Sequence, residues 1–440
     1  MINPLLDGLT TVLLVLSTLL FVIITRYSKR YMMGDPGRQR FSFWLYLTGA
    51  CVIGLVLAQN LLLFALAWLG ISLSLHQLLQ FYSNRPGALL AARKKFLISR
   101  LGDGALLAAL ILVYREFGTW QFQPIFNAAA QLKAAGLERL PLNISWICAL
   151  LVFAALLKSA QFPFHSWLPD TMETPTPVSA LMHAGIINAG GILIIRLSPL
   201  VSLSGAALDA LAMVGGFTAL FASVVMLTQA SVKRNLAFST VAQMGFMMLE
   251  CGLGAFHLAL LHLVAHSLYK AHAFLSAGGA VQAAPQPHKR SVTPVAMGIG
   301  LICALGIFAA TAWMLHADPL DQPVLNGIFV LALAQLIWSA SDRPSSAVVL
   351  GAVLSFAYLL LEGAAAYIVT PLPRETGWLA VPLLALFLVI ALAQAQLPRL
   401  SRSVLGTHLY IHARNGFYLN TLANRLTTAL WPAAIARREI

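Results

Sequence analysis

Ionisable side chains inside long apolar segments are the most informative feature of this sequence. Lys158 ends the apolar run ICALLVFAALLK and is followed by SAQFPFHSWLPD. A lysine buried in a lipid bilayer costs about 2.5–3.5 kcal/mol on insertion scales, so such a residue indicates a function. Other ionisable residues lie within or against apolar segments: His183, His262, His266, Lys270 and Glu362. Together they predict a protein that moves protons or cations.

The segment HLALLHLVAHSLYKAHAF contains a regular row of ionisable residues. His262, His266 and Lys270 are spaced i, i+4 and i+8, so they share one face of a helix. They extend over about 12 Å, close to half the hydrocarbon thickness. Histidine exchanges protons near neutral pH, so such a row can relay protons. The alternatives are histidines capped by neighbouring helices, or a metal site; His257 and His272 are predicted to be structural.

Prolines surround Lys158 and predict an interrupted helix there. Pro163 and Pro169 follow it, and Pro175 and Pro177 open the next helix. An interruption at membrane depth frees backbone groups that only protein or a hydrated cavity can satisfy, and ion sites occur at such breaks. His183 lies two turns into the next helix, where it can face the gap. The alternatives are a lysine that extends to the membrane interface and a core histidine with satisfied hydrogen bonds.

Three acidic residues lie within the apolar segments. Asp103 follows Arg100 by three residues, so it pairs either with that arginine or with Lys158 from a neighbouring helix. Glu362 has no local cation and must find one elsewhere or remain protonated. Glu250, near a helix end, is predicted to lie at the surface.

Composition places the chain in a membrane. Of its 440 residues, 59% are hydrophobic and only 10% are charged, whereas about a quarter are charged in soluble domains. Each membrane span needs about 20 apolar residues, and alternating strand patterns are absent. We therefore predict an all-α polytopic protein of about thirteen transmembrane helices. They begin near Leu5, Phe43, Leu61, Phe96, Ile144, Val178, Ala206, Leu236, Leu258, Val295, Val324, Ala347 and Trp378.

The net charge of +13 is explained by topology and not by nucleic-acid binding. Basic residues cluster in alternate predicted loops, such as Arg26–Arg40 and Arg85–Lys95, and in the C-terminal tail. By the positive-inside rule these loops are cytoplasmic. The N-terminus is then outside and the C-terminus inside, as an odd number of helices requires. The first apolar segment has no basic leader, which predicts an uncleaved first helix.

The sequence offers no cofactor or metal motif. Four isolated cysteines, without CxxC spacing, exclude a zinc or iron–sulfur centre of that type, and no GxGxxG or Walker loop is present. Any redox, nucleotide or zinc chemistry therefore belongs to another chain, and this chain is predicted not to be an enzyme.

Two regions are expected: a transmembrane domain at residues 1–396 and a cytoplasmic tail at 397–440. The tail carries an apolar stripe at helical spacing, which predicts an amphipathic helix at the membrane interface or on a partner. The stripe comprises Leu409, Phe417, Leu419, Leu422 and Leu426.

Several motifs give the chain a family resemblance over roughly Arg26–Gly279, with a thinner match at Asn415–Arg425. GDPGRQRF, RKKFLISRLGD, KSAQFPFHSWLPDTMETPTPVSALMHA and LLHLVAHSLYKAHAFLSAGG resemble the antiporter-like subunits of respiratory complex I and Mrp cation/proton antiporters. This resemblance implies two inverted five-helix repeats, each with a broken helix and a buried lysine. Lys158 would be the first-repeat lysine, His183 its neighbour, and His262, His266 and Lys270 the connecting row.

Two departures from the family pattern concern its charged residues. The family glutamate that tunes the first lysine falls at Leu69, which leaves Asp103 as a candidate substitute. The second-repeat lysine should fall near ATAWMLHADP, where His316 or Asp318 is the candidate replacement. Compared with the complex I subunits, the resemblance also includes no counterpart of their two leading helices or of their long terminal lateral helix.

Three classes of function remain open. The shortened pattern is most similar to the membrane subunit of bacterial inorganic-carbon accumulation complexes. That similarity implies a subunit of the bacterial inner membrane that conducts H+ or Na+. Its ion flow would drive CO2 hydration on a large zinc-bearing, carbonic-anhydrase-like partner. The alternatives are a proton-pumping subunit of a quinone oxidoreductase or an Mrp-type antiporter, and a non-conducting membrane anchor.

Overall fold

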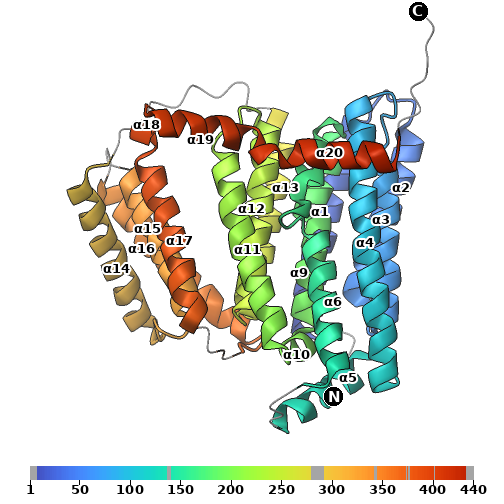
Figure 1. Ribbon diagram of the computed structural model, residues 1–440, viewed down its shortest axis with the longest axis horizontal. Coiled ribbons are helices and arrows are strands. Elements are labelled where there is room, and N and C mark those ends of the chain that lie inside the picture. The colour runs from blue at the N-terminus through green and yellow to red at the C-terminus, as the bar shows by residue number, and fades with distance from the viewer. Residues whose placement is uncertain are drawn as a thin grey trace, which may run out of the picture. The chain divides into compact units, whose positions relative to one another are not determined.

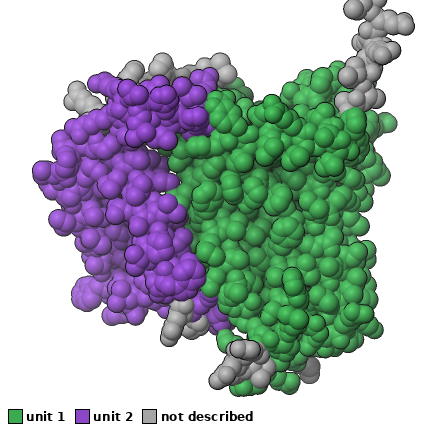
Figure 2. All heavy atoms as spheres, in the orientation of Figure 1, with its two compact units in different colours: residues 1–252, 262–281, 415–440 green, residues 253–261, 282–414 purple. Residues whose placement is uncertain are grey.

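The computed structural model describes residues 7–135, 140–278, 292–340, 344–372, 374, 377–400 and 402–432. These residues are helical or irregular, with only an isolated bridge between Asn60 and Gln121. They form two compact units (Figure 2). Unit 1 comprises 1–252, 262–281 and 415–440, and unit 2 comprises 253–261 and 282–414.

The helices of unit 1 begin with four long apolar ones: α1 (Gly8–Tyr31), α2 (Arg38–Leu57), α3 (Leu61–Leu79) and α4 (Pro86–Phe117). A shorter helix follows as α5 (Phe122–Ala134), and α6 (Leu142–Lys158) precedes the break. Short elements cross the break and the next span: η1 (Phe164–Ser166), α7 (Trp167–Asp170), η2 (Thr171–Glu173), α8 (Thr176–Ala184), η3 (Ile186–Asn188), α9 (Ala189–Arg196) and α10 (Ser198–Val201). Unit 1 also contains α11 (Gly205–Met226), α12 (Val232–Gly252), most of α13 (Phe256–Leu275), η5 (Gly416–Tyr418) and α20 (Leu419–Leu430).

Unit 2 contains the first turn and a half of α13 and six further helices. The six helices are α14 (Pro294–Leu315), α15 (Pro323–Ser339), α16 (Pro344–Ala366), α17 (Gly377–Ala395), α18 (Leu397–Leu400) and α19 (Val404–Arg414). Its core is apolar and is built around Phe308, Leu333, Trp338 and Leu359.

The predicted apolar segments fall on helices of the described residues (Figure 1), and the one that begins near Val178 is divided into α8, η3 and α9. Within the described part of the chain, nine segments are long and apolar enough to cross a membrane, and α6 and α15 are shorter apolar helices. The other two helices, α12 and α13, are more polar, and α13 carries His262, His266 and Lys270 of the predicted ion path. An all-helical membrane protein is therefore confirmed.

Small residues allow α11 and α12 to pack backbone against backbone. A methyl group added at Gly245 would lie 2.5 Å from the Ala219 nitrogen and 2.7 Å from the Gly215 carbonyl oxygen. Such close approach is typical of helix contacts in membranes, where small residues take the place of a hydrophobic driving force. The contact fixes α12, which carries Thr240 and Glu250.

The predicted tail is divided between the two units. Residues 397–414 group with unit 2, whereas 415–440 group with unit 1. Positive φ angles at Phe417 and Tyr418 separate α19 from α20, so the predicted apolar stripe is not one continuous helix face. In unit 1, α20 runs across α4 (Figure 1).

We predict that Gly245→Ala destabilises unit 1 by about 1–3 kcal/mol, because the new methyl group overlaps fixed backbone atoms of α11. Gly104→Ala is the matched control, since nothing lies within 4 Å of the added methyl group there. Thermal unfolding of both variants in mild detergent checks this. Equal melting temperatures for the two variants would show that the α11–α12 contact is not tight.

Candidate functional site

Lys158 is the last residue of α6, and the helix ends there in a well-formed cap. The N–H of Gln161 donates to the carbonyl oxygen of Leu156 at 3.1 Å, and Ala160 adopts φ +51°. This six-to-one bond with a left-handed residue is the Schellman closure, which usually has glycine at the left-handed position. The interruption predicted after Lys158 is therefore present, and it leaves the lysine buried at 8% exposure.

The Lys158 ammonium rests against Trp68 of α3. Its Nζ lies 4.2 Å from the centre of the Trp68 ring and donates to the Trp68 carbonyl oxygen at 3.4 Å. A cation over an aromatic face is stabilised by the negative centre of the ring. Trp68 was not identified from the sequence, although it precedes Leu69, the position of the missing family glutamate.

Asp103 makes the local ion pair that the sequence offered as one alternative. Its carboxylate lies 2.5 Å from Arg100, and it accepts the indole N–H of Trp68 at 2.9 Å. Among the described residues it forms no ion pair with Lys158. The hydrogen-bonded link between Asp103 and Lys158 therefore runs through Trp68.

Two lysines assigned to a cytoplasmic loop lie inside α4 instead. Lys94 and Lys95 are 1% and 3% exposed. Lys95 donates to the Ser72 carbonyl oxygen at 2.8 Å, one turn beyond Trp68 on α3. The loop prediction was wrong because the helix begins at Pro86, before the basic run.

Lys94 takes part in a three-way network with the break and the tail. It contacts Asp170 of α7 at 2.6 Å and the side-chain oxygen of Asn420 in α20 at 2.6 Å. The Asn420 amide in turn donates to Asp170 at 3.0 Å. The three side chains therefore bind one another, and Asn420 holds the polar face of α20 against the rest of unit 1.

His183 is fully buried in α8, between Thr240 and Phe274. Its ring stacks on Phe274 at 4.2 Å, and its Nδ1 lies 3.0 Å from the Thr240 hydroxyl. Thr240 donates its single hydroxyl proton to the Leu236 carbonyl oxygen at 3.0 Å. Nδ1 of His183 must therefore carry a proton and donate it to Thr240.

Lys270 is connected to the same network. It is 0% exposed, and its Nζ donates to the Leu236 carbonyl oxygen at 3.1 Å. That oxygen therefore accepts from both Thr240 and Lys270. The structure thus links His183 to Lys270 through one hydroxyl and one carbonyl group of α12.

His262 and His266 continue the row along α13, as their spacing predicted. Nδ1 of His262 lies 2.9 Å from a Glu250 carboxylate oxygen. Nε2 of His266 lies 3.3 Å from the carbonyl oxygen of His183, and the two α13 rings are 6.2 Å apart. Glu250 is 6% exposed, so its assignment to the surface was wrong: it is buried because it pairs with His262.

Each of the three histidines has one nitrogen that must donate and a second that remains open. A carbonyl or carboxylate oxygen can only accept, which fixes the proton on Nε2 of His266 and on Nδ1 of His262. The other nitrogens are buried without a hydrogen-bond partner among the described residues: Nε2 of His183, Nε2 of His262 and Nδ1 of His266. Each open nitrogen can accept a proton while its neighbour donates one, as a relay requires.

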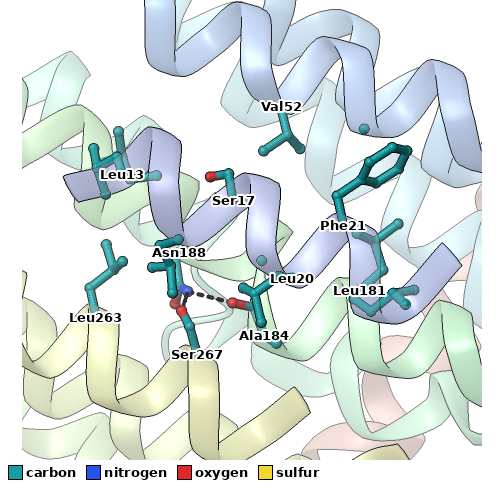
Figure 3. Close-up of a pocket in the computed structure, with 15 residues that line it drawn as sticks. Leu13, Ser17, Leu20, Phe21, Val52, Leu181, Ala184, Asn188, Leu263 and Ser267 are labelled. Atoms are coloured by element: carbon teal, nitrogen blue, oxygen red, sulfur yellow. Dashed lines mark hydrogen bonds between the residues drawn. The ribbon is translucent and has the colours of Figure 1, made fainter. Parts of the chain in front are cut away.

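A second interruption lies beside this row, between α8 and η3. The Asn188 side-chain amide donates to the Ala184 carbonyl oxygen at 3.0 Å and to the Ser267 hydroxyl at 2.8 Å. It thereby satisfies a carbonyl group that the break at Gly185 frees. Figure 3 shows Asn188 at a pocket lined mainly by apolar side chains, including Leu13 and Leu20 of α1.

The predicted residues of unit 2 occupy different surroundings. Glu362 lies beside His257, whose Nε2 is 3.7 Å from its carboxylate oxygen. His316 caps the end of α14 and is exposed, as is Asp318. In the segment where the second-repeat lysine was expected, the buried polar group is Thr311, whose hydroxyl lies 2.5 Å from that of Ser355.

Comparison with known families matches most of the chain. The family model described as "NADH:quinone oxidoreductase/Mrp antiporter, TM" matches residues 58–297. A second, described as "NADH-Ubiquinone oxidoreductase (complex I), chain 5 N-terminus", matches residues 2–42.

Two relatives match over almost the whole chain. "Probable inorganic carbon transporter subunit DabB2" of Halothiobacillus neapolitanus is 39% identical over 98% of this chain and 81% of its own length. "Probable inorganic carbon transporter subunit DabB" of Hydrogenovibrio crunogenus is 37% identical over 98% and 84%. The chloroplastic NAD(P)H-quinone oxidoreductase subunit 5 of Lemna minor is 38% identical, over 62% of this chain and 37% of its own length.

A solved structure has the same fold. A chain of the Mrp complex from Dietzia sp. DQ12-45-1b superposes with a TM-score of 0.58 at 23% identity, covering 97% of this chain and 48% of that one. A helical membrane fold with buried lysines and histidines defines an antiporter-like ion-translocating subunit. The chain belongs to the NADH:quinone oxidoreductase/Mrp antiporter membrane family, and two DabB-type inorganic carbon transporter subunits are similar to it over 98% of its length.

We predict that Thr240→Val lowers the stability of unit 1 by about 1–3 kcal/mol, because it leaves the His183 Nδ1 proton buried without an acceptor. Thr240→Ser keeps the hydroxyl group and is the matched control. Melting temperatures of the two variants in detergent measure the difference. A valine variant as stable as the serine variant would show that the Thr240 hydroxyl does not hold His183.

Proposed function

We propose that this chain is the proton- or cation-conducting membrane subunit of an inorganic-carbon uptake complex. Ion flow through it would drive hydration of CO2 to bicarbonate on a zinc-bearing, carbonic-anhydrase-like partner. The observation that carries the proposal is that two buried titratable groups, His183 and Lys270, are held in one hydrogen-bonded network by Thr240 and the Leu236 carbonyl oxygen.

Burial of the charged groups supports conduction over a purely anchoring role. Lys158 and Lys270 are 8% and 0% exposed, and neither forms an ion pair with a carboxylate among the described residues. An uncompensated cation at such depth destabilises a membrane protein. An anchor would be more stable with leucine at both positions, so their presence favours a role in ion movement.

The relatives that match almost the whole of this chain favour carbon uptake over a respiratory pump. Two DabB-type relatives match 98% of the chain and a third, DabB1 of Halothiobacillus neapolitanus, matches 63%, whereas the chloroplastic oxidoreductase subunit matches 62%. The absence of a lysine near Thr311 also separates this chain from the pump pattern. Since the sequence offers no zinc motif, the hydration chemistry is assigned to the partner.

We further propose that the C-terminus is cytoplasmic and that the membrane is the bacterial inner membrane. In unit 1 the basic loop between α1 and α2 and the loop between α3 and α4 lie on the same side as α20 (Figure 1). Arg26, Lys29 and Arg30 at this side are exposed. The positive-inside rule then assigns this side to the cytoplasm and the N-terminus to the outside.

The outward face of α20 is proposed as part of the partner-docking surface. Leu422, Leu426 and Leu430 are 56%, 55% and 74% exposed, while Asn420 on the other face is fastened to Lys94 and Asp170. A helix that directs polar groups inward and leucines outward has its apolar face available for another surface.

Lys158→Ala is expected to lower ion flux by about a hundredfold or more, since it removes a group that carries the proton. The variant should still assemble, because alanine leaves no buried charge unpaired. Flux in proteoliposomes with a pH-sensitive dye, at fixed and varied Na+, measures this and separates H+ from Na+. The exposed Lys29→Ala is the control. Normal growth of a Lys158→Ala strain at ambient CO2 would contradict the proposal.

The triple variant Leu422→Ser, Leu426→Ser, Leu430→Ser is expected to weaken partner binding by about a hundredfold or more, since each buried leucine contributes about 1.5–3 kcal/mol. Co-purification with the zinc-containing partner in mild detergent measures the loss, with the exposed Thr421→Ala as control. This variant is sharper than deletion of 397–440, which also removes Asn420 from unit 1. An intact complex would exclude α20 from the interface.

A further inference from the structure

Lys158 has no carboxylate partner among the described residues, yet it is buried. Members of the antiporter-like family are expected to oppose this lysine with a glutamate, and here that position is Leu69. The group that occupies the space is the neighbouring Trp68, which is 1% exposed. Its ring centre lies 4.2 Å from the ammonium nitrogen.

Two features of Trp68 act on the ammonium together. The π face attracts the cation electrostatically, and this attraction strengthens where water is excluded. The Trp68 carbonyl oxygen accepts a hydrogen bond from the same nitrogen at 3.4 Å. Both come from one residue of α3, so the position of Lys158 depends on the position of Trp68.

The edge of the same ring is tied to a carboxylate. The indole N–H donates to Asp103 at 2.9 Å, and Arg100 holds the second carboxylate oxygen. A hydrogen bond from a neutral donor to a carboxylate is a strong, charge-assisted bond. It fixes the ring and increases the electron density of the indole, which strengthens the attraction of its face for a cation.

We infer that Trp68 is the positioning residue for Lys158, in the place of an acid in direct contact, and that Asp103 supports this role by fixing the Trp68 indole. The inference rests on the proposed function, in which Lys158 carries the ion. A neutral ring stabilises the ammonium without an ion pair that would have to break during each passage. Trp68 thus positions Lys158 and leaves its ammonium group free of an ion pair with any described residue.

Substitutions separate the contributions of the ring face and the N–H. Trp68→Leu removes both and is expected to lower ion flux about tenfold or more. Trp68→Phe keeps an aromatic ring face but loses the N–H, so a smaller loss of ion flux is expected. Trp120→Phe is the matched control, since its indole N–H donates to the Leu110 carbonyl oxygen away from Lys158.

A double-mutant cycle tests the indirect role of Asp103. Asp103→Asn should lower flux in the wild type but have little further effect in Trp68→Phe, because the connecting N–H is already gone. Additive losses would show that Asp103 acts on Lys158 directly, which overturns this part of the inference. Wild-type flux and sodium dependence in Trp68→Leu would overturn the positioning role itself.

A readout independent of conduction distinguishes failure of the inference from failure of the proposed function. In protein labelled with 5-fluorotryptophan, the fluorine resonance assigned through Trp68→Phe should shift in Lys158→Met and in Asp103→Asn. The exposed Trp313 should not shift. A Trp68 resonance unchanged by Lys158→Met would refute the contact. Shifted resonances in a protein that conducts no ion would instead sustain the contact and refute the proposed function.

Discussion

The absence of water at membrane depth is the constraint on which the site depends. Every buried donor must find an acceptor within the protein, and the acidic residues are too few to serve all of them. The buried cations of unit 1 are therefore held largely by backbone carbonyl groups: those of Trp68, Ser72 and Leu236 accept from three different lysines. A carbonyl oxygen accepts a hydrogen bond from a lysine without forming an ion pair with it, so these contacts do not require a carboxylate beside each lysine.

Packing of small residues positions these acceptors. The contact of Gly215 with Gly245 brings α12 against α11, and α12 carries the Leu236 carbonyl group, Thr240 and Glu250. All three face groups that lie on α8 or α13. The placement of α12 therefore decides whether His183, His262 and Lys270 share one network. Chemistry at the site depends on a backbone contact that contains no ionisable group.

Sequence reasoning found the helices and most charged members of the site, since hydrophobic segments, prolines and i, i+4 spacing are local signals. It missed Trp68 and Thr240, because their roles come from contacts 90 and 57 residues away along the chain. Glu250 and Lys94 were misplaced for the same reason: the partners that allow their burial, His262 and Asp170, lie on other helices. Tautomers of the histidines follow only from the acceptors that surround them.

The two units differ in the kind of polar group that they bury. Unit 1 holds lysines and histidines, whereas the described helices of unit 2 bury a hydroxyl pair, Thr311 and Ser355, and place His257 beside the half-buried Glu362. Hydroxyl groups can pass a proton along but cannot store one, because they do not ionise near neutral pH. Under the proposed function, an ion path whose ionisable lysines and histidines lie in unit 1 needs no second-repeat lysine to release the ion. The loss of that lysine is therefore compatible with conduction down a gradient, in which no step has to move the ion uphill.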